Sequence, residues 1–209
     1  MIKALFLIFQ TGEAWDRVVE AQRSLGFLLV RYLFPMMLMV AVLEGYSLVE
    51  YGKPQAGMFH RIHKSTVGEA VIFECAHSLL TLLTIVVCGV LIKILGETFH
   101  GRYTYKQTFT LVIYAISPIF LFRLLDAVPT VIPWLTWGMG IMLSITILHQ
   151  GIGRVMKPAL PNALALYFMS SLLLAAATGL ERFVTAWYLA GRIQPVENFI
   201  SHLAAHLPF

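Results

Sequence analysis

Long apolar stretches and short polar segments alternate along the chain, and the apolar stretches number five. Each has about 18 residues or more, which as an α-helix is enough to cross a hydrocarbon core roughly 30 Å thick. A helix also satisfies its backbone hydrogen bonds internally, as lipid requires. The pattern predicts an all-α polytopic membrane protein with five transmembrane helices, at residues 26–49, 69–95, 107–128, 134–151 and 162–180.

Segments of mixed polarity flank the five predicted spans. Residues 1–25 place acidic and basic side chains around Trp15, which predicts an interfacial helix with this tryptophan at headgroup level; a docking surface for a partner is the alternative. Residues 182–209 carry apolar side chains at the spacing of a short helix lying on the membrane: Phe199, Ile200, Leu203 and Leu207. We therefore predict interfacial segments at both ends of a five-helix membrane domain, residues 26–181.

The composition excludes a soluble domain of any size. Hydrophobic residues make up 58% of the chain and charged residues 12%, whereas a soluble domain carries roughly 25% charged residues. The net charge of +4 comes from basic residues scattered among helix ends, which is typical of topology signals and contacts with anionic lipids. We expect membrane lipids, other membrane proteins or further copies of the chain as partners, and no nucleic acid.

The distribution of basic residues predicts the orientation. Five spans place the two termini on opposite sides of the membrane. With a cytoplasmic N-terminus, nine lysines and arginines fall inside and six outside. Because cytoplasmic loops are enriched in basic residues, we predict a cytoplasmic N-terminus and a C-terminus outside.

The third and fourth spans form a hairpin from Lys106 to Lys157 with a proline-rich turn. Arg123 and Asp126 precede that turn at i and i+3, so they face the same way and can pair or share water. Within the third span, Pro118 removes a backbone N–H and predicts a kink.

Ionisable residues from three predicted spans fall at one depth in the outer half of the membrane. They form a candidate intramembrane polar cluster: Glu44, Glu74, His77, Arg123 and Asp126. The structural interpretation is a salt-bridge network that fixes helix packing. The functional interpretation is a polar pocket for a lipid headgroup, an ion or a proton.

Four histidines form a second candidate on the predicted outer side. His60 and His63 lie in the first loop, and His202 and His206 share a helical face in the tail. A divalent-metal site is geometrically allowed there. Loose histidine pairs without an HExxH motif favour solvated side chains, so we predict no metal and no other cofactor.

The pattern of a catalytic site is missing from the sequence. Ser117 lacks the surroundings of a nucleophile elbow, and Gly138 and Gly140 lie in a predicted membrane helix instead of after a strand. His77 follows Cys75 by two residues and would point elsewhere on a helix. We predict that the protein is not an enzyme.

Several segments share a pattern with a known family: Ala14–Glu20 (AWDRVVE), Tyr32–Pro35 (YLFP), Gly101–Phe109 (GRYTYKQTF), Tyr114–Pro118 (YAISP) and Ile147–Lys157 (ILHQGIGRVMK). In these segments the sequence resembles the Yip1 family, in particular its bacterial branch. The resemblance implies five spans with a cytoplasmic N-terminus and a place in the bacterial inner membrane.

Eukaryotic members of that family act in vesicle trafficking between endoplasmic reticulum and Golgi, with partners that include Rab GTPases. This sequence lacks their long cytoplasmic N-terminal region, so we do not expect a Rab partner. We predict a non-enzymatic Yip1-like membrane protein that acts as a scaffold or membrane-organising accessory subunit through protein and lipid contacts. A transporter or channel-like protein, with the polar cluster lining a path, is the alternative, although we find no internal repeat of the kind common in transporters.

Overall fold

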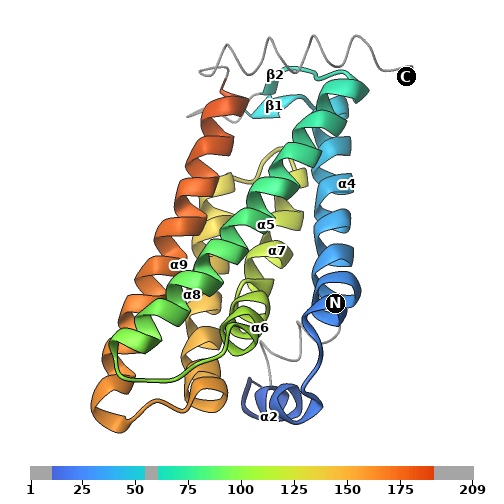
Figure 1. The fold of residues 1–209 in the computed structure, drawn as a ribbon. Helices are drawn as coiled ribbons and strands as arrows, with labels where there is room; N and C mark the ends of the chain where they lie inside the picture. The colour runs from blue at the N-terminus through green and yellow to red at the C-terminus, as the bar shows by residue number, and fades with distance from the viewer. Residues whose placement is uncertain (1–10, 55–60, 191–209) are drawn as a thin grey trace.

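The computed structural model describes residues 11–54 and 61–190. Within these residues, five helices are long and apolar enough to cross a membrane, and they pack side by side (Figure 1). The predicted fold class, all-α with five transmembrane helices, is confirmed. The predicted tail helix and three of the candidate histidines, His60, His202 and His206, lie outside the described residues.

The spans begin and end as follows. The first comprises α3 (Leu25–Leu28), the π-turn η1 (Leu29–Leu33) and α4 (Phe34–Glu50), and the second is α5 (Val67–Thr98). The third comprises α6 (Tyr105–Ala115), α7 (Ser117–Arg123) and the 3₁₀ turn η2 (Leu124–Ala127). The fourth comprises α8 (Pro133–Gly151) and the π-turn η3 (Ile152–Met156), and the fifth is α9 (Leu160–Leu189).

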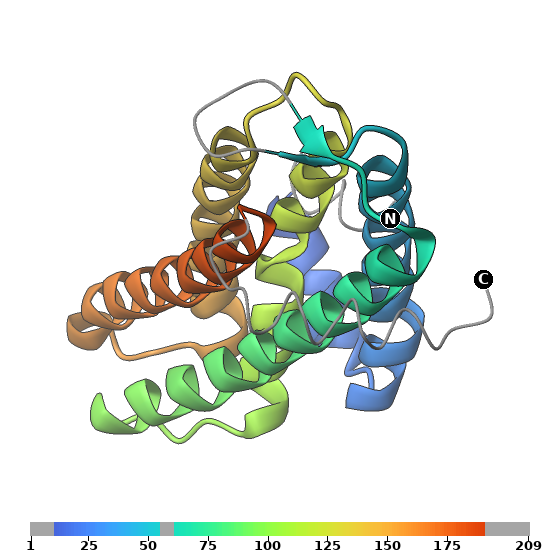
Figure 2. The same ribbon diagram turned by 90° about the horizontal axis from the view of Figure 1, so that it is seen from above.

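The third span is the centre of the bundle. Within its most apolar window 72% of the residues are buried, against 28–44% for the other four spans. Seen from above, α6 and α7 are surrounded by α4, α5, α8 and α9 (Figure 2). Side chains of the third span therefore contact protein on most sides, and the other spans carry the lipid-facing surface.

The central span is broken where proline predicts it. α6 ends at Ala115 and α7 begins at Ser117, because Pro118 cannot continue the backbone hydrogen bonds. The Ser117 hydroxyl lies 2.7 Å from the Tyr32 hydroxyl and 3.1 Å from the carbonyl oxygen of Ile113. Side-chain hydrogen bonds thus join the break to the first span.

Helix α2 (Thr11–Ala21) packs across one end of the bundle (Figure 1). Trp15 has no exposed surface, and its Nε1 donates to the carbonyl oxygen of Ile147 at 3.2 Å. Arg154 Nε donates to Asp16 Oδ1 at 3.1 Å. The depth of Trp15 at headgroup level stays a prediction, but its indole is enclosed by protein because α8 provides both an apolar seat and a hydrogen-bond acceptor.

The opposite end carries a short antiparallel ribbon of β1 (Lys53–Pro54) and β2 (Arg61–His63) (Figure 1). Helix α5 begins directly after it with a capping box, in which Thr66 and Glu69 satisfy each other's backbone N–H groups. The last helix, α9, continues to Leu189, beyond the predicted end of the fifth span at residue 180. This extension places further charged residues inside the bundle.

Candidate functional site

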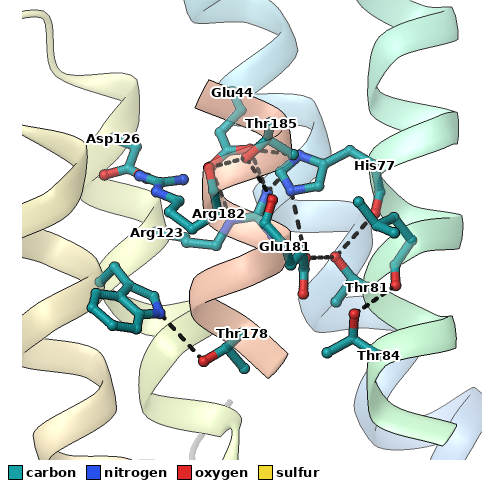
Figure 3. A network of polar contacts seen from close by, with 12 residues as sticks. Glu44, His77, Thr81, Thr84, Arg123, Asp126, Thr178, Glu181, Arg182 and Thr185 are labelled. Atoms are coloured by element: carbon teal, nitrogen blue, oxygen red, sulfur yellow. Dashed lines mark hydrogen bonds and ion pairs between the residues drawn. The ribbon is translucent and has the colours of Figure 1, made fainter. Parts of the chain in front are cut away.

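The polar cluster lies toward the end of the bundle that carries the ribbon, and all five spans contribute side chains to it, Thr136 of α8 included (Figures 1 and 3). Antiparallel packing brings the last turns of α4 beside the first turns of α5, which places Glu44 near Glu74 and His77. Arg123 comes from the end of α7, and Asp126 from η2. None of these five residues is more than 9% exposed, so the predicted residues all lie inside the protein.

A bidentate ion pair between Arg123 and Glu44 is the centre of the cluster. Arg123 Nε donates to Glu44 Oε1 at 3.1 Å, and Nη2 donates to Oε2 at 2.6 Å. Two parallel hydrogen bonds of this kind fix the geometry as well as the charge. The pair joins the first span to the central one.

His77 extends the pair to the fifth span. Arg123 Nη2 lies 3.1 Å from His77 Nδ1, and because a guanidinium can only donate, Nδ1 must be the acceptor. The ring hydrogen is then on Nε2, which lies 3.5 Å from Glu181 Oε1. His77 is thus neutral in this arrangement and links Arg123 to Glu181.

The same oxygen of Glu181, Oε1, accepts a further hydrogen bond from Thr81. The Thr81 hydroxyl lies 2.5 Å from Glu181 Oε1 and 3.0 Å from the carbonyl oxygen of His77. Thr81 and His77 are both on α5, whereas Glu181 is on α9, so these contacts fasten the second span to the fifth.

A second ion pair closes the cluster on the side of α8. Arg182 of α9 pairs with Asp126 and also donates to the carbonyl oxygen of Pro133 at 3.0 Å. The Thr136 hydroxyl lies 2.5 Å from Asp126 Oδ1. Arg123 and Asp126, which the sequence places one turn apart, are each held by an ion pair to a different helix.

A small cavity lies beside these residues. The volume open to the centre of a water molecule is about 20 Å³. Its polar lining consists of His77, Thr81, Arg123, Thr178, Glu181 and Arg182. Since one buried water needs about 10–15 Å³ on this measure, the cavity has room for one or two waters and is too small for a lipid headgroup.

The sequence matches the Yip1 domain over residues 5–180, which is most of the chain. The chain belongs to the Yip1 family. Its match takes in the first four spans and most of the fifth, with every predicted cluster residue, while Glu181 and Arg182 lie just beyond it. No curated protein and no solved structure is significantly similar to this Yip1 protein. Roles for the cluster residues must therefore come from their geometry.

Three cluster residues of the Yip1 protein are close enough to share a cation. Ligand atoms of Glu44, Glu74 and His77 lie within 4.8 Å of one another. However, Arg123 Nη2 already contacts both Glu44 Oε2 and His77 Nδ1. A metal ion there would have to displace a guanidinium that is always charged and leave it buried without its partner. The cation of this site in the Yip1 protein is Arg123.

Sequence reasoning missed Glu181, Arg182, Thr81 and Thr136. The charges mark the end of an apolar run, so the sequence predicts that the fifth span ends at residue 180, with Glu181 as the last residue of the membrane domain and Arg182 as the first residue of the tail. A usable signal existed, because the inward face of α9 repeats polar residues at helical spacing: Ser170, Ser171, Thr178, Glu181 and Thr185. Of the outer histidines, His63 lies in β2, and the interpretation of all four as solvated side chains stays a prediction.

Proposed function

We propose that this Yip1 protein, as a member of the bacterial branch, is a non-enzymatic scaffold or membrane-organising accessory subunit. It works through contacts with lipids and with other membrane proteins or further copies of itself. We place it in the bacterial inner membrane with a cytoplasmic N-terminus and the C-terminus outside. In this orientation the polar cluster is near the outer face.

The observation that carries this proposal is the closure of the polar cluster. Apart from Glu74, its ionisable side chains are engaged with one another across α4, α5, the third span and α9, and the neighbouring cavity has room for no more than one or two waters. Such a network fixes helices against each other and leaves no room for a substrate. A partner would therefore bind to the outer, apolar faces of the spans.

Two of these outer faces are continuous ridges. On the first span, large apolar side chains are exposed at every fourth residue: Val30, Phe34, Leu38, Val42 and Tyr46. On α9 a similar ridge is formed by Leu164, Phe168, Leu172 and Leu180. Residues four apart lie on one helix face, so each ridge is an apolar strip that suits lipid chains or another membrane helix.

Extraction in a mild detergent followed by native mass spectrometry tests the proposal. We expect a stoichiometric partner, a second copy or a specific lipid to stay bound. Val42→Trp on the first ridge should weaken a partner bound there, while Leu79→Trp on α5, at a similarly exposed position, is the matched control. Recovery of a lone monomer with no specific lipid would count against the scaffold role.

A second candidate function, conduction of protons, is favoured by three buried serines. In the described part of the chain, the hydroxyls of Ser144, Ser170 and Ser171 have no hydrogen-bond partner. Unpaired buried hydroxyls mark positions for water. Along α9, Ser170 is about 16 Å from Glu181 at 1.5 Å per residue, so polar groups continue from the cluster toward the middle of the membrane.

Proton flux into liposomes tests this alternative. Glu74→Gln and Asp126→Asn should reduce the flux if the cluster is part of the path. Absence of flux with the unmodified protein eliminates the conduction role and leaves the scaffold role in place.

A further inference from the structure

Acidic groups outnumber basic ones in the buried cluster. Among the described residues it contains four carboxyl groups: Glu44, Glu74, Asp126 and Glu181. Two guanidinium groups, Arg123 and Arg182, oppose them, and His77 is neutral in the observed arrangement. A membrane interior makes unbalanced charge expensive, so a fully ionised cluster with two excess negative charges is disfavoured. At least one carboxyl group should hold a proton.

Three of the four carboxyl groups have partners that stabilise the ionised form. Glu44 has the bidentate contact with Arg123. Asp126 has Arg182 and the Thr136 hydroxyl. Glu181 faces the Nε2 hydrogen of His77 and the Thr81 hydroxyl. These three carboxyl groups are therefore expected to be ionised.

Glu74 differs from the other three. It is only 6% exposed, and in the described residues no hydrogen-bond partner reaches its Oε1. Its stem passes close to α4, where a Cβ added to Gly45 would lie 3.5 Å from Glu74 Cγ. A carboxyl oxygen of Glu74 lies within 4.8 Å of ligand atoms of Glu44 and His77. An ionised Glu74 would thus set a second, unpaired negative charge beside Glu44.

We propose that Glu74 is an intramembrane proton-binding site, a buried carboxylic acid at the contact of α4 and α5 that exchanges its proton with the ribbon side of the membrane. Glu74 is about 10 Å from the start of α5 but about 36 Å from its end, at 1.5 Å per residue. Exchange with water is therefore shortest through the end that carries β1 and β2. This site goes beyond the scaffold role and does not depend on it.

Loss of the proton would act on the central ion pair. The proton leaves a Glu74 oxygen for water, and the carboxylate that remains competes with Glu44 for Arg123. Charged and titratable groups that face this site come from every element around it: Glu44 of α4, His77 of α5, Arg123 of α7, Asp126 of η2, and Glu181 and Arg182 of α9. Since Arg123 is the nearest cation to share, deprotonation is expected to loosen the link between the first and third spans.

Infrared spectroscopy of the protein in liposomes tests the proposal, because a protonated carboxylic acid has a carbonyl band separate from the amide bands. We expect the unmodified protein to show such a band, which disappears as the pH is raised. Glu74→Gln should lose the band completely. Glu97→Gln, an exposed carboxyl group on the same helix, should keep it. A band that persists unchanged in Glu74→Gln at neutral pH, or no band in the unmodified protein at neutral pH, overturns the assignment, because the exposed carboxyl groups are ionised there.

A second variant covers the case in which Glu74→Gln does not fold. Glu74→Asp keeps an acid on a shorter stem, so its band should shift relative to that of the unmodified protein; an identical band would mean that another residue holds the proton. Calorimetric titration with Zn²⁺ or Ca²⁺ tests whether the site binds a metal ion instead of a proton. Stoichiometric binding that Glu74→Gln abolishes would identify a metal site and overturn the proton site.

Discussion

Removal of the Arg123 charge is the sharpest test of the polar cluster. In Arg123→Met the stem of the side chain is largely kept, but Glu44 loses both hydrogen bonds and His77 Nδ1 loses its donor. Breaking a buried ion pair from one side costs roughly 3–5 kcal/mol, because the remaining charge is left uncompensated. We expect a loss of this size in the free energy of unfolding.

The chain offers a matched control at the other end of α5. Lys93 Nζ lies 2.6 Å from Glu97 Oε1, the same distance that separates Arg123 Nη2 from Glu44 Oε2. The Lys93 and Glu97 side chains are 34% and 50% exposed, and an exposed pair four residues apart contributes only about 0.3–0.5 kcal/mol. Lys93→Met should therefore be nearly neutral. Burial, and not distance, distinguishes the two pairs.

A double variant separates the ion pair from simple packing. Glu44→Leu combined with Arg123→Met removes both charges, and apolar replacements of buried pairs are often neutral or stabilising. The double variant should be less destabilised than Arg123→Met alone. Denaturant titration in detergent micelles, followed by circular dichroism, measures all four proteins. A double variant as unstable as the single one, or equal costs for Arg123→Met and Lys93→Met, would refute the reasoning.

The remaining predictions concern the other end of the bundle. A Cβ at Gly151 would lie 2.5 Å from the Trp15 ring, so Gly151→Ala should displace α2 and shift the tryptophan fluorescence to the red, whereas Gly138→Ala, where a Cβ meets nothing within 4 Å, should not. In the connection before α6, partial burial raises the pKa of Tyr103. The folded protein thus favours the neutral form of Tyr103, so the free energy of unfolding should fall as the pH rises above the ordinary pKa of a tyrosine. In a series of unfolding experiments at increasing pH, Tyr103→Phe should remove the part of this fall that is due to Tyr103.

The number and approximate positions of the spans were predictable because hydropathy is a local property. The common depth of Glu44 and Glu74 was predictable as well, since it needs only helix length and antiparallel order. The partners of Arg123 were not predictable from the sequence. Which side chain completes an ion pair depends on which helices are neighbours, and nothing in the local pattern indicates that the third span is central.

The end of the fifth span shows the limit of hydropathy more directly. Glu181 and Arg182 are charges that interrupt an apolar run, so the sequence predicts that the fifth span ends before them. In the structure α9 continues past them, because Glu181 meets His77 and Thr81, and Arg182 meets Asp126. A charge with a partner on another helix can lie inside a span, and sequence alone does not show the partner. The burial of Trp15 in protein was not predictable for a similar reason: an amphipathic ring suits a membrane interface and a protein groove equally well.

The break in the central helix determines which part of the bundle can respond to the cluster. Arg123 ends α7, a segment of seven residues between the interruption at Pro118 and the 3₁₀ turn η2. Because no continuous helix joins α7 to α6, a shift of Arg123 between Glu44 and Glu74 can be absorbed by α7 alone. α6 is separately held against the first span, where the ring centroids of Tyr114 and Tyr32 lie 4.7 Å apart. The part of the third span at the ribbon end can therefore change its pairing while α6 keeps its contact with the first span.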